Sequence, residues 1–187
     1  MSRRINVAGA SGNGKTTVAR AIAARLDLPY VELDALNHGP NWAEASDDTF
    51  LHAVKAATSG EGWVVDGNYQ RKLGDYVLER ADTVVWLDQP LALVLWRLLL
   101  RTERRIRRRE ELWGGNRESW RGVFVGRDSL FAWTIRSHFR NRRKLAGELA
   151  RFPELRVVRL RSPGEVRRFL ENIRAGGPGQ AVGTPGS

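Results

Sequence analysis

Five short apolar runs recur along the chain, and a segment with helical spacing follows each of them. The runs are Ile5–Ala8, Tyr30–Leu33, Trp63–Val65, Thr83–Leu87 and Arg156–Leu160. Runs of β-branched and aromatic residues favour strands, and their alternation with helices favours a parallel sheet with helices on both faces. We therefore predict a three-layer α/β/α fold with a five-stranded parallel sheet. Ligands of such sheets bind at the carboxyl ends of the strands, so the residues after each run are the candidates for chemistry.

The first strand leads into a glycine-rich loop with a complete phosphate-binding pattern. Residues 9–17 read Gly-Ala-Ser-Gly-Asn-Gly-Lys-Thr-Thr, which matches G-x-x-x-x-G-K-[ST] between a strand and a helix. Such a loop turns sharply and presents backbone N–H groups, with the start of the following helix, to phosphate. Lys15 can reach the β and γ oxygens of a triphosphate, and Thr16 offers a hydroxyl to Mg²⁺.

We predict that ATP and Mg²⁺ bind at this loop and that Lys15 also takes part in catalysis. The predicted nucleotide contacts are Gly9, Ser11, Gly12, Asn13, Gly14, Lys15, Thr16 and Thr17. The alternative is a glycine-rich turn that binds nothing.

Three aspartates follow predicted strands. Asp34 could accept the proton of a substrate hydroxyl or orient it, or it could cap the following turn. Asp66 follows three apolar residues, a pattern typical of a carboxylate that holds Mg²⁺ opposite Thr16. Asp88 is its rival for Mg²⁺, but it could instead cap the helix that starts near Pro90. We prefer Asp66 as the metal residue.

Two further residues near the same sheet edge are candidates for substrate binding beside Asp34. Trp42 could stack on a base or a sugar, or pack against the next helix. Arg71 follows the third strand and brings a positive charge to the same end of the sheet. We predict that Asp34, Trp42 and Arg71 bind the substrate.

The excess positive charge of the chain is concentrated in one region. The net charge is +10, from 31 basic and 21 acidic residues, and residues 97–144 alone hold 15 basic and five acidic residues, which also gives +10. A local anionic partner explains this distribution better than general solubility does.

A helical pattern with an apolar stripe opens this region. The stripe is predicted as Leu91, Leu95 and Leu98, while Arg97, Arg101, Arg104 and Arg108 recur on another face. Because this helix begins beside the nucleotide site, we predict that Arg97 and Arg101 hold polyphosphate and stabilise the transferring phosphoryl group.

Glycines and aromatic residues interrupt the basic region, which predicts a mobile helical lid over residues 102–140. Its second helix should begin near Asp128 and carry Arg136, a predicted catalytic residue, on one face with Arg140. The turn at 161–164 predicts a backbone contact of Arg161 to the adenine ring. Residues 1–174 are predicted to form one domain, and 175–187 a disordered tail.

The chain has no cysteine, which excludes a disulfide framework and cysteine-bound metals. No apolar stretch has the length of a signal peptide or a membrane span. We expect a soluble, cytoplasmic protein.

These motifs together resemble a small P-loop kinase of the adenylate kinase and shikimate kinase type. The chain is most similar to the group known as topology-modulation proteins or adenylate-kinase-like ATPases. The features that carry the resemblance are residues 9–16, Leu33-Asp34-Ala35-Leu36 with Trp42, Asp66-Gly67-Asn68-Tyr69, Leu87-Asp88-Gln89-Pro90 with Leu95-Trp96-Arg97, and the Trp133–Arg143 segment. The resemblance implies that Arg97 and Arg101 flank the nucleotide base and its phosphates. The AMP-binding pattern of adenylate kinases is absent from residues 30–42.

We expect a phosphotransferase that moves the γ-phosphate of MgATP to a nucleotide, a nucleoside or another small hydroxyl compound. Two alternatives remain open. The first is a nucleic-acid-linked ATPase that binds backbone phosphates through residues 97–144 and stacks bases on the interleaved tryptophans. The second is a nucleotide sensor without catalytic turnover.

Overall fold

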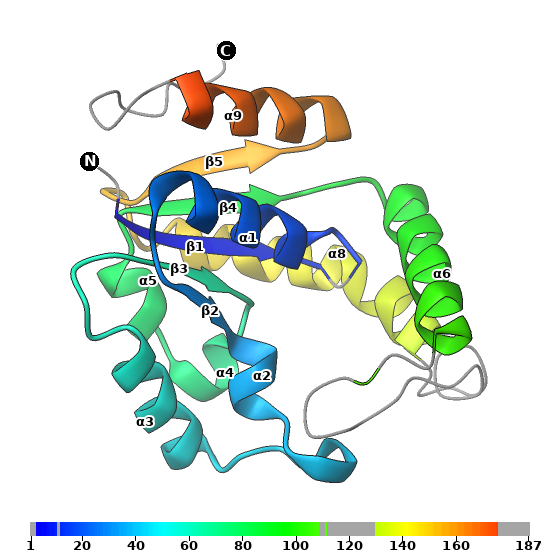
Figure 1. The fold of residues 1–187 in the computed structure, drawn as a ribbon, viewed down its shortest axis with the longest axis horizontal. Helices are drawn as coiled ribbons and strands as arrows, with labels where there is room; N and C mark the ends of the chain where they lie inside the picture. The colour runs from blue at the N-terminus through cyan, green and yellow to red at the C-terminus, as the bar shows by residue number, and fades with distance from the viewer. Residues whose placement is uncertain (1–2, 11, 109–110, 112–129, 176–187) are drawn as a thin grey trace.

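A single parallel sheet with five strands organises the molecule (Figure 1). The computed structural model describes residues 3–10, 12–108, 111 and 130–175. The strands are β1 (Arg4–Gly9), β2 (Tyr30–Glu32), β3 (Trp63–Asp66), β4 (Thr83–Leu87) and β5 (Arg156–Leu160), in the order β2-β3-β1-β4-β5. The predicted fold class and the five predicted strands are confirmed.

Helices cover both faces of this sheet. On one face lie α1 (Lys15–Leu26) and α9 (Pro163–Ala175), whose apolar side chains join the inward residues of β1, β3, β4 and β5 in one core. On α9 the inward residues are Val166, Phe169, Leu170 and Ile173, spaced as one face of a helix requires.

The opposite face is covered by four helices in two groups. The helices α3 (Asp47–Ala57) and α4 (Gln70–Leu73) pack around Phe50, Val54 and Trp63. The helices α5 (Tyr76–Arg80) and α8 (Leu130–Leu149) pack against Trp86 and its neighbours on β4. Strands buried on both faces explain why the sequence shows continuous apolar runs rather than alternation.

The remaining elements lie near the carboxyl ends of the strands. They are α2 (Leu33–Asn37), the 3₁₀ turn η1 (Pro40–Trp42) and α6 (Leu91–Arg107). In Figure 1 the strand arrows point toward α6. Leu33, predicted as the last residue of a strand, instead begins α2, so Asp34 belongs to a helical turn and not to the strand end.

The apolar stripe predicted for α6 is wrong in part. The fully buried positions are Val94, Leu98 and Thr102, whereas Leu91 and Leu95 are only partly covered. The reason is that α6 packs beside the loop at 9–14, where the Val94 carbonyl and the Leu98 side chain lie next to Gly12.

Several predictions concern residues outside the described part of the chain. These are Ser11, residues 112–129 of the predicted lid, and residues 176–187 of the predicted tail. Among the helices that are described, none combines the length and the apolar character that crossing a membrane requires.

Phe50 offers a direct test of the core on the α3 face. Its ring is fully buried and meets the Tyr69 ring edge-to-face at 5.0 Å between centroids. Phe50→Ala should lower the free energy of unfolding by about 3–5 kcal/mol, because it removes apolar contacts and leaves a cavity. Thermal unfolding would measure the loss, with His52→Ala on the exposed side of α3 as the control. Equal melting temperatures for the two variants would contradict this account of the core.

Candidate active site

The loop after β1 approaches its neighbours so closely that it has no room for side chains at two glycines. A Cβ at Gly9 would lie 2.6 Å from the Leu87 carbonyl oxygen, and one at Gly12 would lie 2.9 Å from the Val94 carbonyl oxygen. Both residues also have positive φ, 149° and 82°, which side chains disfavour. The loop then ends at Gly14, the N-cap of α1.

Two asparagine side chains anchor the loop backbone. The Asn13 side-chain amide donates to the Leu87 carbonyl at 2.6 Å. Asn68 binds Gly9 twice, because its amide nitrogen donates to the Gly9 carbonyl at 2.8 Å and its oxygen accepts from the Gly9 N–H at 3.2 Å. Asn68 was not among the predicted site residues, and its only signal in the sequence is its place just after Asp66-Gly67.

The first turn of α1 presents the residues expected to meet phosphate. Lys15, Thr16 and Thr17 line one cavity together with Gly12 and Gly14. The Lys15 ammonium donates to the Ala10 carbonyl across the loop at 3.2 Å. A helix N-terminus with free N–H groups and a lysine beside it is a general anion-binding arrangement.

Asp66 and Thr16 lie together, as the sequence predicted. The Thr16 hydroxyl donates to Asp66 Oδ2 at 2.7 Å, and the Tyr30 hydroxyl donates to the same oxygen at 3.2 Å. Burial raises the pKa of the Asp66 carboxyl above its usual value, and the Lys15 charge and the Thr16 hydrogen bond oppose that rise. A hydroxyl and a carboxylate at the edge of a phosphate site are oxygen ligands of the kind that Mg²⁺ prefers, so these residues fit that ion.

Asp88 serves a different purpose. Its buried carboxylate pairs with Arg159 at 2.6 Å and with Arg142 at 3.0 Å, which joins β4 to β5 and to α8. The suggestion that Asp88 caps α6 is wrong, because Pro90 is the N-cap and no side chain caps this helix. With two arginines on its carboxylate, Asp88 is a poor candidate for Mg²⁺, which supports the preference for Asp66.

A cavity of about 1050 Å³ opens in front of the loop. Cationic and acidic side chains both line it. The cations are Lys15, Arg20, Arg97, Arg101, Arg104 and Arg105, and the carboxylates are Glu32, Asp34 and Glu111. This excess of positive charge suits a strongly anionic ligand.

The arginine row of α6 faces this cavity, with one change from the predicted set. Arg97, Arg101 and Arg104 line it as expected, but Arg105 takes the place predicted for Arg108, which is exposed at the helix C-cap. Arg105 lies four residues after Arg101, a spacing that marks the same helix face. Arg97 also touches the loop, since it donates to the Asn13 carbonyl at 3.1 Å and to Gln89 Oε1 at 2.5 Å.

Asp34 lies on the wall of this cavity beside Glu32. The Tyr69 hydroxyl donates to Asp34 Oδ1 at 2.6 Å. The N-cap of α2 is Glu32, and no side chain caps that helix, so the capping alternative for Asp34 is wrong.

Seven predicted site residues are not among the described residues that line the cavity: Gly9, Asn13, Trp42, Asp66, Arg71, Arg136 and Arg161. Gly9 and Asn13 belong to the loop itself, and Asp66 accepts the hydrogen bond of Thr16, which does line the cavity. Trp42 is 42 % exposed and meets His38 edge-to-face at 5.8 Å. Arg71 and Arg136 are exposed on α4 and α8. The Arg161 N–H already donates to Glu165 at 2.7 Å, and Pro163 and Val166 of the same segment line the cavity instead.

Comparison with known proteins agrees with the fold. A model of the ATPase family associated with various cellular activities (AAA) matches residues 5–88, from β1 to the residue after β4. No curated protein matches the chain in sequence.

Solved structures of small kinases resemble the whole chain at low sequence identity. A shikimate kinase from Bacteroides thetaiotaomicron is 14% identical, with a TM-score of 0.57 over 94% of this chain and 98% of its own. A shikimate kinase from Acinetobacter baumannii in complex with shikimate is 19% identical, with a TM-score of 0.56 over 92% and 91%. A gluconokinase from Sinorhizobium meliloti 1021 is 19% identical, with a TM-score of 0.50 over 92% and 95%. The chain thus has the fold of these small-molecule kinases, with a phosphate-binding loop between β1 and α1.

Asp66→Asn tests the metal assignment. Because the folded protein holds the Asp66 proton to higher pH than the unfolded chain, this carboxyl's contribution to stability is present at acid pH and is lost as the pH rises through its raised pKa. Without ligands, the melting temperature of the variant relative to wild type should therefore rise as the pH increases from about 4 to about 8. With ATP and Mg²⁺, wild type should gain stability that the variant lacks.

Thermal unfolding with a non-hydrolysable ATP analogue, in Mg²⁺ or in EDTA, would measure both effects. An equal Mg²⁺-dependent rise in wild type and Asp66→Asn would contradict the assignment.

Proposed function

We propose that this protein is an ATP-dependent phosphotransferase that acts on a small hydroxyl compound. One observation carries the proposal: the phosphate loop, Thr16, the arginine row of α6 and Asp34 all border the same cavity. Asp66 lies behind Thr16 and accepts its hydrogen bond at 2.7 Å. Phosphoryl transfer requires a donor site, an acceptor site and positive charge between them, rather than covalent chemistry by the protein.

The donor half is formed by the loop and α1. The backbone N–H groups at residues 12–17 and the Lys15 ammonium bind the phosphates of ATP. When bound at Thr16 and Asp66, Mg²⁺ would neutralise phosphate charge. Arg97 and Arg101 line the cavity from α6 and stabilise the charge of the transferring group.

The acceptor half is centred on Asp34. Its carboxylate accepts one hydrogen bond from Tyr69 and lines the cavity. A carboxylate in this place can orient an acceptor hydroxyl and take its proton during transfer. The solved structures named as shikimate kinase and gluconokinase make shikimate and gluconate the first acceptors to test.

Two other functions would give different results in the same assays. A nucleic-acid-linked ATPase would bind an oligonucleotide at low salt through exposed arginines such as Arg107 and Arg108, and it would form no phosphorylated small molecule. A nucleotide sensor would bind ATP and lose that binding in Lys15→Ala, yet show no turnover with any acceptor.

A screen for ATP-dependent products tests the proposal directly. Shikimate, gluconate, nucleosides, nucleotides and small hydroxy acids would be offered with MgATP, and a phosphorylated product detected by mass spectrometry. Asp34→Asn should lower kcat by about 10²–10⁴-fold with the active acceptor, because general-base catalysis is lost. The dissociation constant for ATP should stay the same. No product from any acceptor would reject the proposal, and full activity of Asp34→Asn would reject the role of Asp34.

The arginine row can be tested on one helix. Arg97→Gln and Arg101→Gln should each lower kcat by about 10²-fold or more, because they remove charge from the place where phosphoryl transfer occurs. Arg107→Gln is the matched control, since Arg107 is exposed and pairs with Glu103 at 2.7 Å. Steady-state kinetics and oligonucleotide binding at low salt would be measured for all three. Equal loss of turnover in the control would contradict the assignment of helix faces.

A further inference from the structure

The segment that follows β3 contacts both halves of the proposed site. Asn68 binds the backbone of Gly9 in the phosphate loop through two hydrogen bonds. The next residue, Tyr69, donates to Asp34 on the acceptor side. Three residues further, Lys72 contacts the chain that leads from α2 to α3. Within five residues, the chain thus connects the donor loop to the acceptor carboxylate.

Tyr69 is held firmly in its position. Its ring lies against the buried Phe50 ring, at 5.0 Å between centroids. Burial and the adjacent Asp34 charge raise the pKa of the Tyr69 hydroxyl above its usual value, so the hydroxyl stays protonated and donates to the carboxylate. A charge-assisted hydrogen bond of 2.6 Å is among the stronger side-chain interactions.

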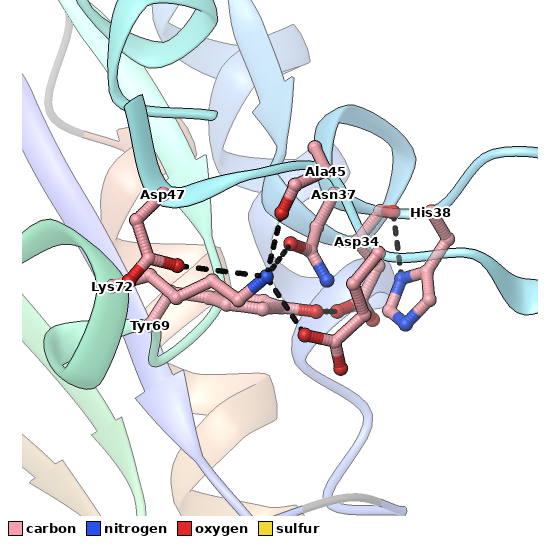
Figure 2. A network of polar contacts seen from close by, with 8 residues as sticks. Asp34, Asn37, His38, Ala45, Asp47, Tyr69 and Lys72 are labelled. Atoms are coloured by element: carbon pink, nitrogen blue, oxygen red, sulfur yellow. Dashed lines mark hydrogen bonds and ion pairs between the residues drawn. The ribbon is translucent and has the colours of Figure 1, made fainter. Parts of the chain in front are cut away.

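Lys72 is an unusual cation because its side chain is only 7% exposed. Its ammonium donates to Asn37 Oδ1 and to the Ala45 carbonyl, each at 2.9 Å, and pairs with Glu44 at 2.7 Å (Figure 2). Asp47 adds a longer contact at 3.9 Å. The hydrogen bond to Lys72 lowers the pKa of the Glu44 carboxyl.

These contacts fix the chain that follows Asp34 at two points. Asn37 is the last residue of α2, the helix that carries Asp34, and Ala45 lies just before α3. On the same helix, His38 Nδ1 contacts the Asp34 carbonyl at 3.1 Å. Figure 2 shows Tyr69 and Lys72 side by side, with Tyr69 reaching Asp34 and Lys72 reaching the end of α2.

We propose that Tyr69 and Lys72 are positioning residues that set the place of the Asp34 carboxylate relative to the phosphate loop. Tyr69 fixes one carboxylate oxygen and leaves the other for the acceptor hydroxyl. Lys72 holds α2 and the following loop against α4. Since Asn68 ties the same segment to Gly9, the separation between the phosphoryl donor and the acceptor carboxylate is set by one short stretch of chain. This inference rests on the proposed phosphotransferase function.

The test compares two tyrosines of the same helical layer. Tyr69→Phe removes only the hydroxyl that binds Asp34. Tyr76→Phe is the matched control, because the Tyr76 hydroxyl is also partly buried and contacts Thr58 Oγ1 at 3.2 Å, away from the cavity. For each variant, kcat, KM for ATP and the melting temperature would be measured with MgATP and the acceptor of the screen that wild type phosphorylates fastest.

Tyr69→Phe should lower kcat about tenfold or more, because small displacements of a reacting group cost rate steeply. Its KM for ATP should stay within about twofold of wild type, since the donor loop keeps its own contacts. Tyr76→Phe should change the melting temperature by a similar amount and leave kcat unchanged. A merely structural role for Tyr69 would move stability in both variants and kcat in neither.

Lys72→Met adds a readout that does not depend on turnover. Hydrogen exchange of the backbone amides at 33–45 should become faster, while exchange at 14–26 should stay the same. If this variant does not fold, Tyr69→Phe carries the test. Unchanged exchange at 33–45 in a folded variant would overturn the role of Lys72.

Failure of this inference and failure of the proposed function give different results. If wild type transfers phosphate but Tyr69→Phe is equally active, the positioning role is overturned and the proposed function stands. If wild type forms no phosphorylated product with any acceptor of the screen, the proposed function fails and the positioning role fails with it.

Discussion

The close approach of the loop backbone to the ends of β4 and α6 is the constraint on which the site depends. The Leu87 carbonyl oxygen lies only 2.6 Å from the place of a Cβ at Gly9, and it also accepts a hydrogen bond from the Asn13 side-chain amide at 2.6 Å. The loop therefore packs on the buried end of β4. Because β4 is buried on both faces, its end cannot shift without disturbing the core. The direction in which α1 begins, and with it the place of Lys15 and Thr16, follows from this contact.

The distribution of charge determines which ligands this cavity attracts. The chain carries a net charge of +10, and much of that charge faces inward from one side of α6. Like charges gathered around a cavity repel one another, and an anion that enters relieves the repulsion. The same field raises the rate at which anionic ligands arrive. Glu32, Asp34 and Glu111 are the acidic side chains of the same lining, and Glu32 is already paired with Arg20 at 3.1 Å.

Much of the fold could be predicted from local sequence because its signals are local. Each strand is a continuous apolar run, and the phosphate loop is a contiguous motif. The pairing of Thr16 with Asp66 could also be predicted, since both residues follow strands that end at the same sheet edge. Leu33 was misassigned because an apolar residue after a strand can either extend that strand or begin the next helix.

The residues that were missed depend on tertiary contacts. Asn68 is a single side-chain amide that follows a turn. Nothing in the sequence around it indicates that it would bind Gly9. Arg71 was predicted to bind the substrate and Lys72 was not considered. One residue along a helix rotates the side chain by about 100°, so Arg71 is exposed and the Lys72 side chain is buried. The two partners of Asp88 lie 54 and 71 residues further along the chain, at Arg142 and Arg159. No sequence pattern could have indicated these pairs.

The contact between Gly12 and the first turns of α6 has a mechanical consequence. The loop backbone rests against Val94 and Leu98, and Arg97 binds the Asn13 carbonyl one turn away. A phosphate bound at the loop would therefore lie beside the base of the helix that carries the arginines. Because the loop and α6 pack directly on each other, neither can move far without the other.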